Sequence, residues 1–127
     1  MKILLDTCDF LWFISGDPSL PVKTKQEVQN PDNEVFLSVV SLWEIILKNA
    51  LGKLPLPESP DIYIPAQRNL HGIRLLNLEE SSVNKLAGLP AIHRDPFDRM
   101  LICQAQDQAL HLASSDPIVR QYPVTLL

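Results

Sequence analysis

Four acidic residues stand where a parallel α/β fold would bring their carboxylates together: Asp6, Glu44, Asp98 and Asp116. Each follows an apolar segment typical of a strand or lies near the start of a helical pattern. Close carboxylates repel one another unless a cation lies between them, and hard divalent cations prefer oxygen ligands. The spacing therefore predicts one acidic site that binds a hard divalent cation.

Each acid also has a local structural explanation. Asp6 could cap the helix that follows it, and Asp116 could be a turn residue before a proline. The segment Ser41-Leu42-Trp43-Glu44 fits a capping box, although Ser38 is the better cap for this helix. Asp9 is expected to point away from the site as an ordinary acid of the first helical turn. The structural reading holds only if all these explanations are true together.

A second acid accompanies Asp98 at the start of its helix. Asp95-Pro96-Phe97-Asp98 could be an N-cap, a first-turn proline and a third-position carboxylate favoured by the helix dipole. Residues three apart share one helix face, and the local explanation does not account for two acids, Asp95 and Asp98, on the same face. Arg94 and Arg99 are candidates for binding a substrate phosphate, or they pair with neighbouring acids. His93 is expected to be structural.

Strands and helices alternate along the chain. Short apolar runs predict strands at residues 2–5, 34–38, 73–76 and 111–114, with residues 124–126 as a candidate fifth strand. In open parallel sheets, ligands bind beyond the carboxyl ends of the strands, where these acids would lie. We therefore expect a single domain over residues 1–127, a three-layer α/β/α fold around a central parallel sheet of four to five strands.

Helical spacing predicts the segments that cover this sheet. Helices are expected over residues 7–15, 38–51 and 60–70, and from Asp95 onward to about residue 110. Ser19, with a proline two residues later, predicts the cap of a polar helix that runs to about residue 30. Asn77, with an acid three residues later, predicts the cap of a helix that ends at residue 87 or 88. Pro65 is expected to kink or restart its helix.

Composition narrows the class of protein. The chain has 127 residues, of which 46% are hydrophobic and 20% charged, as in ordered soluble proteins. It has no apolar stretch of about 20 residues and no recognisable secretory signal, so we expect a cytoplasmic protein without a membrane segment. Cys8 and Cys103 are expected to be reduced.

The formal net charge of −4 argues at first against nucleic acid, because phosphate binders usually carry a basic excess. The chain has fifteen acids and eleven bases. If five acids converge in one pocket and bind cations, the remaining ten are balanced by the bases. The acidic composition is therefore compatible with a metal-dependent nuclease but does not by itself predict one.

In this order, the residues resemble the PIN domain, and more narrowly the VapC-like toxin nucleases of bacterial toxin–antitoxin pairs. The resemblance covers nearly the whole chain, and its most telling segments are Leu4-Leu5-Asp6-Thr7, Ser41-Leu42-Trp43-Glu44-Ile45, Leu51-Gly52-Lys53-Leu54, His93-Arg94-Asp95-Pro96-Phe97-Asp98-Arg99 and Ser114-Ser115-Asp116. The family more often has threonine at the position of Ser114, but serine keeps the hydroxyl that can orient a carboxylate.

The resemblance implies a metal-dependent endoribonuclease. Mg²⁺ or Mn²⁺ would be held by Asp6 and Asp98, with Glu44 and Asp116 completing the metal shell or orienting the attacking water, and Glu44 as a conceivable general base. Asp95 would be an accessory acid at the same helix start as Asp98. It also implies an RNA substrate, such as a structured or transfer RNA, a small cognate antitoxin and a homodimer. Whether one or two metal ions bind is left open.

The sequence disfavours two other classes of protein and leaves a third open. An aspartyl-phosphate phosphohydrolase needs a second aspartate two residues after the first, where this chain has Cys8. A receiver-like switch needs a phosphorylatable aspartate after its third strand and a late lysine, whereas the chain has Asn77 there and no lysine beyond Lys85. A PIN-like module that binds RNA or protein without catalysis stays open.

Overall fold

The computed structural model describes the whole chain, Met1–Leu127. Four strands form one parallel sheet in the order β3-β2-β1-β4, with β1 at Lys2–Leu5, β2 at Glu34–Ser38, β3 at Arg74–Leu76 and β4 at His111–Ala113. The predicted α/β fold with a parallel sheet is confirmed. None of the helices combines the length and the hydropathy that a membrane crossing requires.

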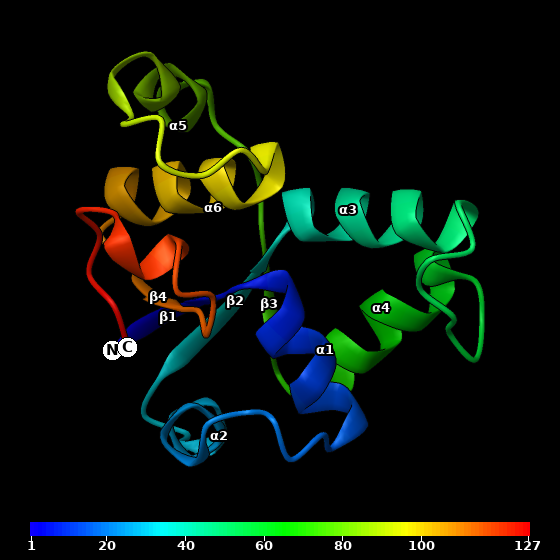
Figure 1. The fold of residues 1–127 in the computed structure, drawn as a ribbon. Coiled ribbons are helices and arrows are strands. Elements are labelled where there is room, and N and C mark those ends of the chain that lie inside the picture. Colours follow the sequence, from blue (N-terminus) through cyan, green and yellow to red (C-terminus); the bar gives the residue numbers. More distant parts are fainter.

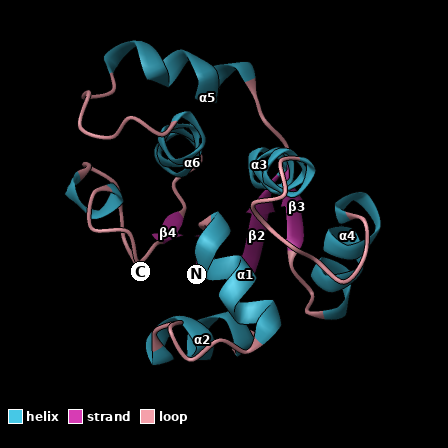
Figure 2. Cartoon of the chain, turned by 45° about the vertical axis from the view of Figure 1, so that its right-hand side comes forward, coloured by secondary structure: helices cyan, strands magenta, loops and turns pink.

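Helices lie on both sides of this sheet (Figure 1). Six are α-helices: α1 at Thr7–Ser15, α2 at Val22–Gln29, α3 at Val39–Ala50, α4 at Pro60–Leu70, α5 at Glu80–Asn84 and α6 at Pro96–Asp107. Two 3₁₀ turns, η1 at Lys85–Gly88 and η2 at Val119–Gln121, complete the chain. Figure 2 shows α6 on the opposite side of the strands from α1 and α2.

Alternation along β1 builds two cores, because successive side chains of a strand point to opposite faces of a sheet. Ile3 and Leu5, both fully buried, join the cluster that contains Phe10 of α1 and Ile64 of α4. Leu4 joins the other cluster, which is built largely from α6 and the residues around η2. Burying each of these large side chains contributes about 1.5–3 kcal/mol, so β1 is anchored from both faces.

The register brings three strand ends to one edge of the sheet. Leu5, the last residue of β1, lies opposite Leu37 of β2 and Ala113 of β4. The residue after each of these positions, which includes Asp6 and Ser114, therefore reaches the same edge. This edge is where the sequence places its acids.

Two predicted helix caps are wrong. Helix α2 begins at Val22 after Pro21 and has no side-chain cap, because the Ser19 N–H donates to Asp17 Oδ1 and holds Ser19 in a turn. Helix α5 begins after Glu79, also without a side-chain cap. The backbone carbonyl of Asn77 instead accepts a hydrogen bond from Gln104 of α6, which fixes Asn77 outside the helix.

Two further expectations need correction. Pro65 does not restart its helix, since α4 is assigned without interruption from Pro60 to Leu70. The candidate fifth strand is reduced to one parallel bridge between Leu112 and Leu126. The backbone hydrogen bonds at this bridge run from the Leu112 N–H to the Thr125 carbonyl and from the Leu127 N–H to the Leu112 carbonyl. The sheet therefore has four strands.

Candidate active site

Asp6 occupies the edge directly after β1 and is also the N-cap of α1. Its Oδ1 accepts hydrogen bonds from the backbone N–H groups of Cys8 at 2.8 Å and Asp9 at 3.1 Å. Only 5% of the residue is exposed. Asp6 therefore both caps α1 and lies at the edge of the sheet, and the cap hydrogen bonds fix the direction of its carboxylate.

The second oxygen of Asp6 is oriented from the neighbouring strand. Ser114 Oγ donates to Asp6 Oδ2 at 2.7 Å, and the same Oγ accepts the backbone N–H of Asp116 at 3.2 Å. Asp116 Oδ1 accepts the N–H of Ile118 at 2.8 Å, which gives this carboxylate a fixed turn geometry. Ser114 therefore places both acids.

Glu44 comes to the edge on α3, which Ser38 caps by accepting the Val40 N–H at 3.0 Å. The cap therefore lies at Ser38 and not at Ser41, as predicted. Glu44 is 3% exposed; its Oε2 forms an ion pair with Lys48 Nζ at 2.5 Å. Its Oε1 is buried and has no hydrogen-bond partner.

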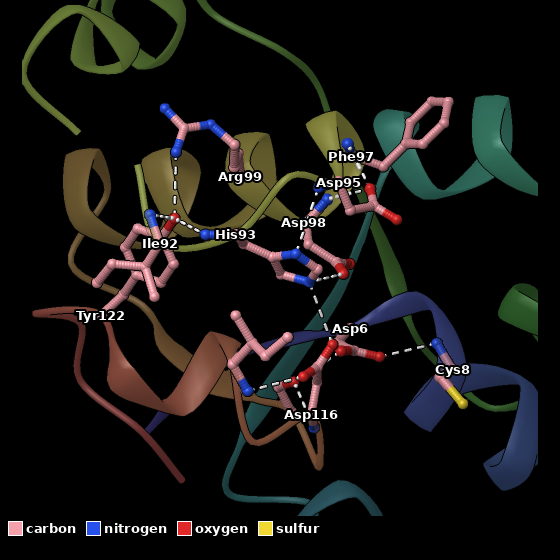
Figure 3. Close-up of polar contacts among 12 residues, drawn as sticks. Asp6, Cys8, Ile92, His93, Asp95, Phe97, Asp98, Arg99, Asp116 and Tyr122 are labelled. Carbon is pink, nitrogen blue, oxygen red and sulfur yellow. Dashed lines mark hydrogen bonds and ion pairs between the residues drawn. The ribbon is translucent and has the colours of Figure 1, made fainter. Parts of the chain in front are cut away.

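Helix α6 brings Asp95 and Asp98. Asp95 is the N-cap and accepts the N–H groups of Phe97 at 2.8 Å and Asp98 at 3.1 Å through Oδ1. Asp98 Oδ2 lies 2.9 Å from His93 Nε2, and the same nitrogen lies 3.2 Å from Asp116 Oδ2 (Figure 3). His93, for which the sequence predicts a structural role, thus contacts two of the four predicted acids.

Asp9 contradicts its sequence interpretation. It does not point to solvent: the residue is 1% exposed, its Oδ2 accepts a hydrogen bond from Ser115 Oγ at 3.2 Å, and its Oδ1 is buried without a partner. The signal was present in the sequence, because Asp9 lies three residues after Asp6 at the start of α1. Residues at this spacing share one face of a helix.

These side chains surround a cavity of about 430 Å³ at the carboxyl edge of the sheet. All four predicted acids, Asp6, Glu44, Asp98 and Asp116, line it together with Asp9 and Asp95. Lys48 and Lys53 are its only basic lining residues. The predicted convergence of the acids is therefore present, with one acid more than expected.

The predicted arginines lie elsewhere. Arg99 Nη1 donates to the carbonyl of Pro90 at 2.8 Å and to the hydroxyl of Tyr122 at 3.1 Å. Arg94 is exposed, and neither arginine lines the cavity. Lysines at the end of α3 and in the loop after it supply the positive charge near the acids.

Burial and mutual repulsion make these carboxylates weaker acids. Burial raises the pKa of Asp6. Burial, followed by the charge of Asp6, raises the pKa of Asp9 to about 7. Burial, followed by the charges of Asp95, Asp6 and Glu44, raises the pKa of Asp98 to about 7. A site of this kind favours the binding of protons or cations.

The donor set fits a hard divalent cation. Carboxylate oxygens dominate it, and buried oxygens of Glu44 and Asp9 have no partner within the protein. Ligand atoms of His93, Asp98 and Asp116 all lie within 4.8 Å of one another. Mg²⁺ or Mn²⁺ is therefore the kind of ion that these residues suit, with Asp6, Glu44, Asp98 and Asp116 as its candidate ligands.

Solved structures share this fold. The chain is similar to VapBC2 from Rickettsia felis bound to a DNA fragment from its promoter (TM-score 0.66, 14% identity, 100% of this chain and 97% of that chain). It is also similar to a DNA-bound VapBC from Salmonella typhimurium (TM-score 0.65, 16% identity, 99% and 96%) and to VapBC-1 from nontypeable Haemophilus influenzae (TM-score 0.62, 19% identity, 95% and 91%).

Sequence comparisons agree with this similarity of fold. Over 59 residues, 46% of this chain, it is 36% identical to the ribonuclease VapC16 of Mycobacterium tuberculosis, and the match spans 42% of that relative's length. A family model described as the PIN domain matches residues 3–124, nearly the entire fold that carries the acidic cavity. On this match, the chain belongs to the PIN-domain family.

Proposed function

We propose that the protein is a metal-dependent endoribonuclease that hydrolyses RNA phosphodiester bonds at the acidic cavity. The observation that carries the proposal is the convergence of Asp6, Glu44, Asp98 and Asp116 on one cavity, with a buried Glu44 oxygen that has no partner. Membership of the PIN-domain family and the partial identity to a ribonuclease support the same activity.

The ion would be Mg²⁺ or Mn²⁺, held by Asp6, Glu44, Asp98 and Asp116. When bound, it would supply activation of a water molecule and neutralisation of charge on the scissile phosphate. Ser114 holds Asp6 in a fixed orientation through its 2.7 Å hydrogen bond. Asp95 directs the start of α6 through its two N-cap bonds and so fixes the position of Asp98.

The remaining lining groups have separate roles in this proposal. Lys48 and Lys53 attract an RNA phosphate toward a cavity that would otherwise repel it. Glu44 Oε1, buried and without a partner, either completes the metal shell or accepts a proton from the attacking water in this proposal. Glu44 and Lys48, one turn apart on α3, thus supply a carboxylate and a positive charge to the same cavity.

The proposed partners are a small antitoxin and a second copy of the chain. Trp43 and Leu47 of α3 and its C-cap residue Leu51 recur every four residues and are 61%, 42% and 60% exposed. Trp43 also packs edge-on against Phe97, with ring centroids 4.8 Å apart. Such an exposed apolar stripe suits a protein interface, and one solved structure of similar fold is a toxin–antitoxin complex from Klebsiella pneumoniae.

RNA cleavage tests the activity. The purified chain is incubated with pooled cellular RNA in Mg²⁺, Mn²⁺ or EDTA, beside an Asp6→Asn/Asp98→Asn double variant. A matched control, Asp32→Asn/Glu58→Gln, removes the same charge from two exposed acids. We expect metal-dependent cleavage by the wild type and the control, and none by the site variant.

The second candidate is a PIN-like module that binds RNA or protein without catalysis. The ion pair between half-exposed Lys48 and buried Glu44 favours it, because this pair gives one of the four acids a partner within the protein. RNA binding by the wild type with no cleavage in any metal would support this candidate over the nuclease. Equal cleavage by the wild type and the site variant would contradict the nuclease, because it would point to a contaminating enzyme, and would leave the binding module as the first candidate.

A further inference from the structure

We propose that His93 is a positioning residue that locks the carboxylate of α6 to the carboxylate after β4 and so sets the cation affinity of the cavity. The inference rests on the proposed function, since it assumes that the acids bind a divalent cation. The contact on which it depends is the approach of one imidazole nitrogen to two carboxylates, shown in Figure 3.

The backbone at His93 is held from a distant part of the chain. The N–H groups of Ile92 and His93 donate to the hydroxyl of Tyr122 at 3.0 and 2.6 Å. Arg99 donates to the same hydroxyl at 3.1 Å. Tyr122 is 4% exposed and belongs to the core cluster on the α6 face, so this anchor is rigid. The segment before α6 therefore cannot move independently of the core.

The orientation of the imidazole follows from its other nitrogen. The backbone N–H of Asp95 donates to His93 Nδ1 at 3.3 Å, which requires a lone pair on Nδ1. The ring proton is therefore on Nε2. Nε2 donates this proton to Asp98 Oδ2 at 2.9 Å and Asp116 Oδ2 at 3.2 Å, and a nitrogen that carries a proton cannot coordinate a cation.

This shared hydrogen bond connects two acids that no other side chain joins. Asp116 Oδ1 accepts a hydrogen bond from the Ile118 N–H, and Asp116 Oδ2 accepts one from His93, so both oxygens of Asp116 are held. Asp98 keeps its Oδ1 available for a cation while Oδ2 is held. Without the imidazole, two like charges would face each other with no donor between them and would separate.

Loss of such an outer partner typically weakens metal binding by about 10–100-fold. We therefore expect the Mn²⁺ dissociation constant to rise by about this factor in His93→Ala. His93→Gln retains a donor amide of similar reach and should recover most of the affinity. His71→Gln is the matched control, because His71 packs edge-on against Phe13 and does not line the cavity.

The experiment is a titration of the purified full chain with Mn²⁺, with free Mn²⁺ measured by electron paramagnetic resonance. It is done in the absence of RNA. The four proteins are the wild type, His93→Ala, His93→Gln and His71→Gln, and urea unfolding in EDTA verifies that each is folded. Pulsed measurements on the Mn²⁺-loaded proteins then detect any nitrogen bound directly to the ion.

Weakened binding in His93→Ala, recovery in His93→Gln and no directly bound nitrogen in the wild type would support the positioning role. Equal affinity in the wild type and His93→Ala would overturn it while leaving the proposed metal site intact. A wild-type nitrogen signal that disappears in His93→Gln would also overturn it, because His93 would then be a ligand. A wild type that binds no Mn²⁺ would overturn the proposed function itself.

Discussion

Ser114 Oγ and Asp6 Oδ2 lie 2.7 Å apart and join residues separated by 108 positions at the ends of neighbouring parallel strands. The bond is buried and lowers the pKa of Asp6 against the larger effect of burial. It therefore helps to keep this carboxylate ionised and aimed in one direction, both of which a cation ligand requires.

Ser114→Ala should weaken both folding and cation binding. The change leaves a buried Asp6 oxygen without its donor, which costs about 1–3 kcal/mol of unfolding free energy. Urea unfolding in EDTA and Mn²⁺ titration measure the two effects. Ser114→Thr keeps the hydroxyl and should behave like the wild type; a Thr variant as weak as the Ala variant would contradict the role of the hydroxyl.

The raised pKa values of Asp9 and Asp98 predict an inverse pH dependence of stability. Both are about 7 in the folded protein, against about 3.9 for an aspartate in an unfolded chain. Between these values the folded protein binds more protons than the unfolded chain, so the free energy of unfolding falls as pH rises from about 4 to 7.

Urea unfolding in EDTA at pH 5, 6, 7 and 8 measures this slope. A saturating divalent cation should remove most of the decline, because it stabilises the ionised carboxylates at the higher pH. Stability that rises steadily from pH 5 to pH 8 in EDTA would mean that the acids are not clustered as described.

Asp9→Asn should stabilise the metal-free protein at pH 8. The wild-type carboxylate is charged there, 1% exposed and has an oxygen without a partner, so removing the charge removes a desolvation cost. At pH 5 the wild-type group is already protonated, and the variant should gain little. Unfolding free energies at both pH values test this; the same gain at each would show that charge is not the cause.

The sequence was sufficient to predict the architecture and the four acids because both follow from local patterns. Apolar runs at residues 2–5 and 34–38 match β1 and β2 within the bounds of the structure. The residue that follows a parallel strand reaches the carboxyl edge regardless of distant contacts, so the placement of Asp6 could be predicted without knowing its neighbours.

The errors concern residues whose environment is set by distant segments. The burial of Asp9 depends on Ser115, and the bridging role of His93 depends on Asp116 and on the anchor at Tyr122. The partners Ser115, Asp116 and Tyr122 cannot be read from a periodic pattern, although the three-residue spacing of Asp6 and Asp9 does indicate a shared helix face. The cap at Asn77 failed for the same reason, because its carbonyl is bound by Gln104 of α6.

Lys48→Met should change stability and cation affinity in opposite directions. In the metal-free protein Lys48 is the ion-pair partner of buried Glu44, and its loss should cost less than the about 3–5 kcal/mol of a fully buried pair, because Lys48 is itself half-exposed. With Lys48 absent, Glu44 Oε2 is available to a cation, so Mn²⁺ should bind more tightly than to the wild type.

Unfolding in EDTA and Mn²⁺ titration measure the two changes. Lys53→Met is the control, because it removes a positive charge from the cavity lining that is not paired with Glu44. Weaker Mn²⁺ binding in Lys48→Met would mean that the lysine orients Glu44 for the ion and does not compete with it.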